Sequence, residues 1–136
     1  MNRMQDAKTL NAQYKTAHSL NIRIAFHQKY SLQTQPFHDW LFSQYAFTPG
    51  MRILEIGCGP GALAESLHRW YPNAEIIGMD RDSRFISYAG EHIKGVTFME
   101  GDATALPFDD NSFDVTLLFG PLYHLYEPQD VQKSID

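Results

Sequence analysis

The chain has 136 residues, 43% of them hydrophobic and 20% charged, and a net charge of -5, values typical of one folded domain rather than of a disordered or fibrous chain. The negative balance argues against nucleic acid or anionic lipid as a partner, and no apolar run reaches the roughly 20 residues of a membrane span. Cys58 is the only cysteine and the polar start lacks a secretory signal, so we expect a cytoplasmic protein without disulfides, membrane or metal partners.

Residues 1–50 are predicted to be helical and to form a lid or cap. Apolar residues recur there at helical spacing in two clusters: Leu10, Tyr14 and Ala17, then Ile22, Ala25, Phe26 and Tyr30. Pro36 suits the first turn of a further helix that Thr48 to Gly50 end. We expect this helix to carry one apolar face: Phe37, Trp40, Leu41 and Tyr45.

From residue 51 to residue 136 short apolar runs alternate with helical stretches, which predicts βαβ units and a mostly parallel sheet. Strands are expected over 51–56, 74–79, 96–100 and 113–119, with helices over 62–71 and from 83 onward. The apolar runs 53–56 and 115–119 are nearly continuous, as in strands covered on both faces. The fourth strand should return to the other side of the first, which makes the gap between their tips the expected ligand site.

The segment Glu55 to Gly61 closes the first strand with glycines at positions 57, 59 and 61. Glycine permits backbone angles and close approaches that a Cβ would block, so a ligand can lie against bare peptide. The same residues also satisfy the dinucleotide pattern G-x-G-x-x-G/A. On these residues alone, an NAD-dependent oxidoreductase remains an alternative, and an exposed charge at a strand end is the alternative for Glu55.

Acidic residues stand at the tips of the next two strands. Asp80 ends the second strand beside the glycine loop and can accept hydrogen bonds from ribose hydroxyls. Arg81 and Asp82 follow as solvated neighbours or helix-capping residues. Asp102 follows the third strand, where a plain turn is the alternative because Gly101 and Asp102 are good turn formers.

The run Ile53 to Gly61 resembles motif I of class I S-adenosyl-L-methionine (SAM)-dependent methyltransferases, and the likeness extends to Leu125. Leu106 to Phe108 and the acidic loop 109–112 make it similar to the UbiE-like, or type 11, members. The resemblance implies an α/β, Rossmann-like class I methyltransferase fold, with Glu55 near the amino group of SAM and Asp102 and Ala103 at its adenine. The cofactor-binding residues that we expect are Tyr30, Glu55, Gly57, Cys58, Gly59, Gly61, Asp80, Arg81, Asp102 and Ala103.

The segment Gly120 to Leu125 follows the fourth strand and is also similar to the type 11 family. Gly120 stands where base methyltransferases carry Asp or Asn, so a small-molecule methyl acceptor is the expected substrate. Tyr123 and His124 are the candidate catalytic residues, as acceptor contacts or a general base. A structural aromatic pair is the alternative for them.

The sheet implied by the resemblance is incomplete in this sequence. The family's domain has seven strands, whereas residue 136 falls in the helix after the fourth strand, so we expect an incomplete C-terminal part and an exposed apolar edge. A fragment, a truncated reading frame, or a homodimer that covers this edge would each account for it. A catalytically idle SAM-binding fragment is therefore the alternative to an active methyltransferase.

Overall fold

The computed structural model describes residues 21–22, 25–26, 29–30, 37–121 and 125–136. Its helices are α3 (Phe37–Ser43), α4 (Ala62–Trp70), α5 (Ser83–His92) and α6 (Pro128–Ile135), and the described residues between 21 and 30 are also helical. The strands are β1 (Arg52–Ile56), β2 (Glu75–Asp80), β3 (Thr97–Glu100) and β4 (Val115–Leu118). None of the helices described is long and apolar enough to cross a membrane.

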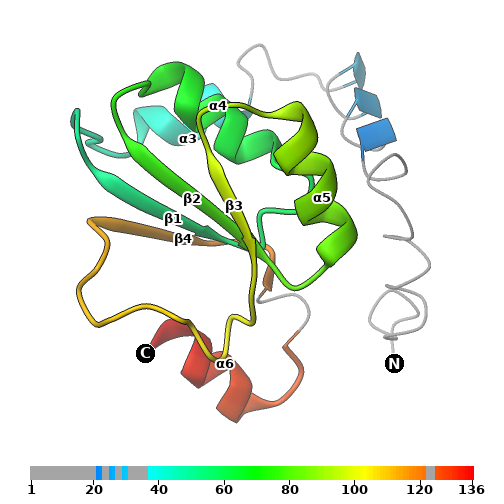
Figure 1. The fold of residues 1–136 in the computed structure, drawn as a ribbon, viewed down its shortest axis with the longest axis vertical. Coiled ribbons are helices and arrows are strands. Elements are labelled where there is room, and N and C mark those ends of the chain that lie inside the picture. Colours follow the sequence, from blue (N-terminus) through cyan, green and yellow to red (C-terminus); the bar gives the residue numbers. More distant parts are fainter. Residues whose placement is uncertain (1–20, 23–24, 27–28, 31–36, 122–124) are drawn as a thin grey trace.

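The four strands form one parallel sheet in the order β3-β2-β1-β4. Leu54 in the middle of β1 lies opposite Ile77 of β2 on one side and Thr116 of β4 on the other. The predicted α/β class and the return of the fourth strand to the far side of the first are thus confirmed. Because all strands run the same way, their carboxyl ends meet at one edge of the sheet (Figure 1).

Each face of the sheet has its own apolar core. One core joins β1, β2 and β4 to α3 and α4: Leu41, Phe42, Ile53, Leu63, Ala64, Leu67, Ala74, Ile76 and Leu117. The other core lies under the long connection between β3 and β4 and consists of Leu54, Ile56, Ile77 and Met79. In that connection the rings of Phe108 and Phe113 pack edge to face, with centroids 4.8 Å apart. Figure 1 shows α3, α4 and α5 on one side of the sheet and α6 on the other. β1 is buried along nearly its whole length, which explains its continuous apolar run, whereas only Leu117 is buried in β4, so the expectation of a strand covered on both faces is wrong for 115–119.

One expectation for the helices is wrong in detail. The helix that begins near Phe37 ends at Ser43, so Tyr45 lies beyond it. The chain tightens there, because Gln44 N donates to Leu41 O at 3.1 Å and the Ser43 hydroxyl donates to Trp40 O at 2.6 Å.

Trp70 at the end of α4 is 47% exposed and rests edge to face on Phe42, with ring centroids 5.6 Å apart. Tryptophan is large and is seldom fully buried, even where one edge of its ring packs against the core.

Phe98 of β3 packs across two glycines of neighbouring segments. A Cβ placed on Gly78 of β2 would lie 2.8 Å from the Phe98 ring, and one placed on Gly61 would lie 3.0 Å from it. The absence of side chains at these two positions therefore lets β2 and the start of α4 approach the ring closely.

The helical residues near the N-terminus contact α5. The side-chain amide of Asn21 donates a hydrogen bond of 3.1 Å to the hydroxyl of Tyr88. The Tyr88 ring in turn stacks on His92, with centroids 4.0 Å apart. This contact joins the N-terminal segment to the helix that follows β2.

Candidate functional site

The loop from β1 to α4 is built on three glycines with positive φ: Gly57 (76°), Gly59 (54°) and Gly61 (95°). Its start is bonded to the tip of β2, because the backbone N–H groups of Gly57 and Cys58 donate to Met79 O at 2.7 and 3.0 Å. A Cβ on Gly57 would lie 2.5 Å from Cδ of Pro121. Both the backbone angle and this close approach therefore require glycine at position 57.

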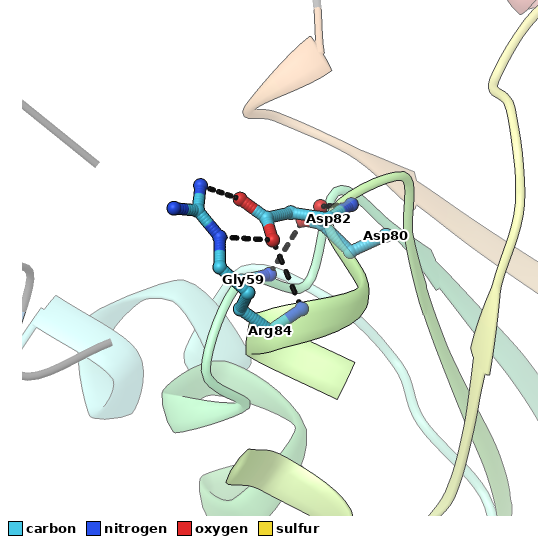
Figure 2. Close-up of polar contacts among 4 residues, drawn as sticks. All are labelled: Gly59, Asp80, Asp82 and Arg84. Atoms are coloured by element: carbon cyan, nitrogen blue, oxygen red, sulfur yellow. Dashed lines mark hydrogen bonds and ion pairs between the residues drawn. The ribbon is translucent and has the colours of Figure 1, made fainter. Parts of the chain in front are cut away.

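Asp80 joins this loop to the start of α5. Its Oδ2 accepts a hydrogen bond of 2.9 Å from Gly59 N, and its Oδ1 accepts one of 2.8 Å from Asp82 N (Figure 2). Each carboxylate oxygen has a second lone pair, so both can still accept from a ligand hydroxyl. The expected place of Asp80 beside the glycine loop is what the structure shows.

Asp82 caps α5. Its Oδ1 accepts from Arg84 N at 3.0 Å, and its carboxylate pairs with the Arg84 guanidinium at 2.7 Å (Figure 2). The hydrogen bonds from Arg84 are the main reason why the pKa of Asp82 lies below its ordinary value. The helix-capping alternative therefore holds for Asp82, whereas Arg81 is exposed.

Glu55 is buried, with 6% of its surface exposed. The alternative of an exposed charge at a strand end is therefore wrong. Burial, and to a smaller extent the nearby Asp80 carboxylate, raise its pKa to about 8, while a hydrogen bond from the Ala64 backbone acts in the opposite direction. Its Oε2 has no hydrogen-bond partner within the described ranges. A buried oxygen without a partner indicates a place for a hydrogen-bond donor that the protein itself does not supply.

Cys58 fills the interior of the loop. Its side chain is 6% exposed and its sulfur lies 3.5 Å from Gly59 O. Burial raises the pKa of the thiol, as do the carboxyl groups of Glu55 and Asp80, so the thiol stays neutral. A neutral buried thiol is a poor nucleophile, which agrees with a packing role.

The tip of β3 joins the same edge, since Gly101 N donates to Asp80 O at 3.0 Å. Next to it, Oδ1 of Asp102 accepts hydrogen bonds from Thr104 N at 2.8 Å and from the Thr104 hydroxyl at 2.7 Å. These bonds lower the pKa of Asp102, with a smaller contribution from Arg81. Asp102 is thus an exposed carboxylate held in a turn, as the turn alternative expected. The role of Thr104 was missed, although an Asp two residues before a Thr favours such a turn.

Of the candidate site residues Tyr30, Tyr123 and His124, the structure describes only Tyr30. Tyr123 and His124 lie outside the described residues. Tyr30 is 60% exposed, and its ring packs against Phe26 at 4.6 Å and beside Lys29 Nζ at 5.4 Å within its own helical segment. Pro121, which the sequence did not single out, is the residue after β4 that contacts the glycine loop.

These residues fit SAM chemically. Its amino group is a cation that suits the unpartnered Oε2 of Glu55, and its ribose hydroxyls are donors that suit Asp80. The diphosphate of a dinucleotide, by contrast, brings no hydrogen-bond donor for Oε2 of Glu55, and any negative charge on Glu55 would repel it. The geometry therefore favours SAM over NAD.

Comparison with known proteins agrees with the resemblance to methyltransferases. Residues 53–136 match the family model described as a methyltransferase domain. The chain is 40% identical to a fatty-acid O-methyltransferase of Mycolicibacterium smegmatis over 84 residues, which cover 60% of this chain and 30% of that protein. It is 40% identical to a demethylmenaquinone methyltransferase of Thermotoga maritima over 70 residues, which cover 51% of this chain and 31% of that protein.

Among solved structures, a TehB-like SAM-dependent methyltransferase from Corynebacterium glutamicum superposes with a TM-score of 0.67 at 17% identity, over 88% of this chain and 62% of that one. This likeness supports the fold. The aligned part of the chain spans about a third of the length of the two curated relatives. Because the family model covers more than half of the chain, the chain belongs to the methyltransferase-domain family of class I SAM-dependent methyltransferases.

Proposed function

We propose that this chain binds SAM at the carboxyl edge of its sheet and serves a methyltransferase that acts on a small-molecule acceptor. The observation that carries the proposal is the buried Glu55, whose Oε2 lacks a partner in the described part of the chain, beside a loop that requires glycine at position 57. In this proposal Glu55 holds the amino group, Asp80 the ribose, and Asp102 with the Ala103 backbone the adenine. SAM supplies an activated methyl group on a sulfonium.

The task of the protein in such a transfer is to align the acceptor with the methyl group and to exclude water. Pro121, which lies against Gly57, brings the segment after β4 to the glycine loop. Tyr123 and His124 follow within three residues of Pro121 and are proposed to contact the acceptor or remove its proton. We also propose that residues 1–50 form a lid, for which the bond between Asn21 and Tyr88 is the supporting contact.

The acceptor is proposed to be a small molecule because the curated relatives are named for such acceptors, a fatty acid and a demethylmenaquinone. A side-by-side calorimetric titration with SAM, S-adenosylhomocysteine and NADH tests the cofactor. We expect the first two to bind and NADH to fail, whereas preference for NADH would refute the proposal. Transfer of radiolabelled methyl groups from SAM to fatty acids and quinols then separates an active enzyme from an idle binding fragment.

The open edge of β4 leads to a separate proposal. Within the described chain β4 pairs with β1 alone, and Phe119 at its end is 41% exposed. We propose that a second copy covers this edge. Light scattering tests this, since a monomer has a mass of 15.6 kDa and a homodimer twice that.

A further inference from the structure

Glu55 and its surroundings carry an inference about how the proposed site selects its ligand. The carboxyl group is buried under α4, opposite Gly78 on β2 and Leu117 on β4. Neither of these two residues offers a charge or a hydrogen-bonding side chain. A lone carboxylate in such a place is unfavourable, so the group must either hold a proton or meet a cation.

The charged and titratable groups that act on Glu55 come from two other segments. The Asp80 carboxylate at the tip of β2 repels negative charge on Glu55, and the Cys58 thiol in the loop is coupled to it as well. From α4 the only contribution is a hydrogen bond from the Ala64 backbone. All charges in this set are negative or absent, so no positive charge among these groups compensates a carboxylate at position 55, and the Ala64 hydrogen bond does so only in part.

The backbone donors of the loop are already used. Gly59 N and Asp82 N both donate to Asp80, and Gly57 N and Cys58 N both donate to Met79 O. These four N–H groups therefore leave Oε2 of Glu55 without a partner. A donor that completes this carboxyl group therefore comes from outside the described chain, and the ammonium group of a ligand is one such donor.

We propose that Glu55 holds a proton in the free protein and releases it when the ammonium group of the ligand binds, so that the site selects ligands with a primary ammonium group. This inference rests on the proposed function, because SAM is the ligand that brings this group. Before binding there is a neutral carboxylic acid and a free ammonium cation. Afterwards there is a carboxylate-ammonium pair, and the proton has left to solvent. No other bond forms or breaks.

The proton exchange makes affinity depend on pH in a defined direction. The pKa of Glu55 is about 8 in the free chain, so at pH 7 about nine-tenths of the molecules carry the proton. Binding at pH 7 should then release about 0.9 proton, and the Kd should fall almost tenfold from pH 6 to pH 7. The α-amino group of the ligand, with a pKa of about 8, is itself about nine-tenths protonated at pH 7, so its own titration changes this count by only about 0.1 proton.

Isothermal titration of the 136-residue chain with S-adenosylhomocysteine, in two buffers of different ionisation enthalpy, counts the protons. We expect the wild-type chain to release about 0.9 proton per ligand bound at pH 7. The control variant Glu65→Gln, a matched change on the exposed face of α4, should release the same amount. Glu55→Gln should release none and lose the pH dependence. 5′-Methylthioadenosine, which lacks the amino acid part, should bind without proton release to either.

Each outcome is decisive. Binding without proton release in the wild-type chain, or with equal release in Glu55→Gln, overturns the inference and leaves the proposed cofactor intact. A failure of S-adenosylhomocysteine to bind the wild-type chain overturns the proposed function, and the inference with it. If Glu55→Gln does not fold, carbon-13 NMR of the Glu55 carboxyl in the wild-type chain, with and without ligand, decides the point. An unchanged protonation state on binding refutes the inference.

Discussion

The backbone N–H of Gly59 donates a hydrogen bond of 2.9 Å to the side chain of Asp80, 21 residues further along the chain. This bond joins the glycine loop after β1 to the tip of β2. The same carboxylate accepts from Asp82 N, so one side chain sets the position of the loop and the first turn of α5 (Figure 2). Asp80 is thus a structural support as well as the proposed ribose ligand.

Replacement of Asp80 by alanine should therefore weaken SAM binding. Loss of a charged acceptor costs about 1.5 to 3 kcal/mol, which corresponds to roughly tenfold to a hundredfold in Kd by calorimetry. Asp114→Ala is the matched control, because Asp114 also accepts a hydrogen bond from a backbone N–H, that of Arg52 at 2.8 Å, but lies just before β4. Equal losses of affinity in the two variants would contradict a ligand role for Asp80.

Stability should depend on pH through Glu55. Because its pKa is raised to about 8, the folded chain holds a proton that the unfolded chain loses near pH 4.5, so stability falls as pH rises between these values and levels off above pH 8. From pH 6 to pH 7 the free energy of unfolding should fall by about 1 kcal/mol more in the wild-type chain than in Glu55→Gln. Urea unfolding measures this, and parallel pH profiles for the two chains would count against a buried, protonated Glu55.

Gly57→Ala should destabilise the fold. The left-handed φ of 76° and the approach of Pro121 Cδ to 2.5 Å together cost about 2 to 4 kcal/mol for an added methyl group. Gly90→Ala makes the same chemical change in α5, where a Cβ meets nothing within 4 Å. That variant should gain about 1 kcal/mol from helix propensity. The midpoint of thermal unfolding should thus shift in opposite directions in the two variants, and a Gly57→Ala chain at least as stable as the wild type would argue against a strict need for glycine at position 57.

Asp82→Ala should cost about 1 kcal/mol, because α5 loses the side-chain cap on Arg84 N. Asp82→Asn keeps an acceptor oxygen and removes only the charge, so it should stay close to the wild-type chain. The ion pair with Arg84 is exposed and adds little. Urea unfolding of both variants checks this, and an equal loss in each would assign the effect to charge rather than to the cap.

The topology and the place of Asp80 were predictable from sequence because they follow from short-range rules. Alternation of apolar runs with helical spacing indicated βαβ units, and parallel strands place their tips at one edge. Asp82 was identifiable as a cap because Asp is a preferred residue just before a helix. These features depend on residue type and spacing, which the sequence states directly.

The details that the sequence patterns did not predict depend on side-chain contacts, most of them between distant segments. The burial of Glu55 depends on the neighbouring strands β2 and β4 and on α4, whose Ala64 backbone bonds to it, and no local pattern encodes these contacts. The contact of Pro121 with Gly57 joins segments 64 positions apart. The early end of α3 depends on a side-chain bond from Ser43 to the backbone of Trp40. Sequence periodicity alone cannot weigh that bond against one more helical turn.

The packing of Phe98 over Gly78 has a consequence for how related chains vary. Gly78 has an ordinary strand conformation, so what bars a side chain there is the Phe98 ring, which would lie 2.8 Å from an added methyl group, rather than the backbone angle. A smaller residue at position 98 would make room for alanine at position 78. These two positions, on adjacent strands, should accordingly change together, whereas Gly61, with its φ of 95°, should stay glycine whatever residue occupies position 98.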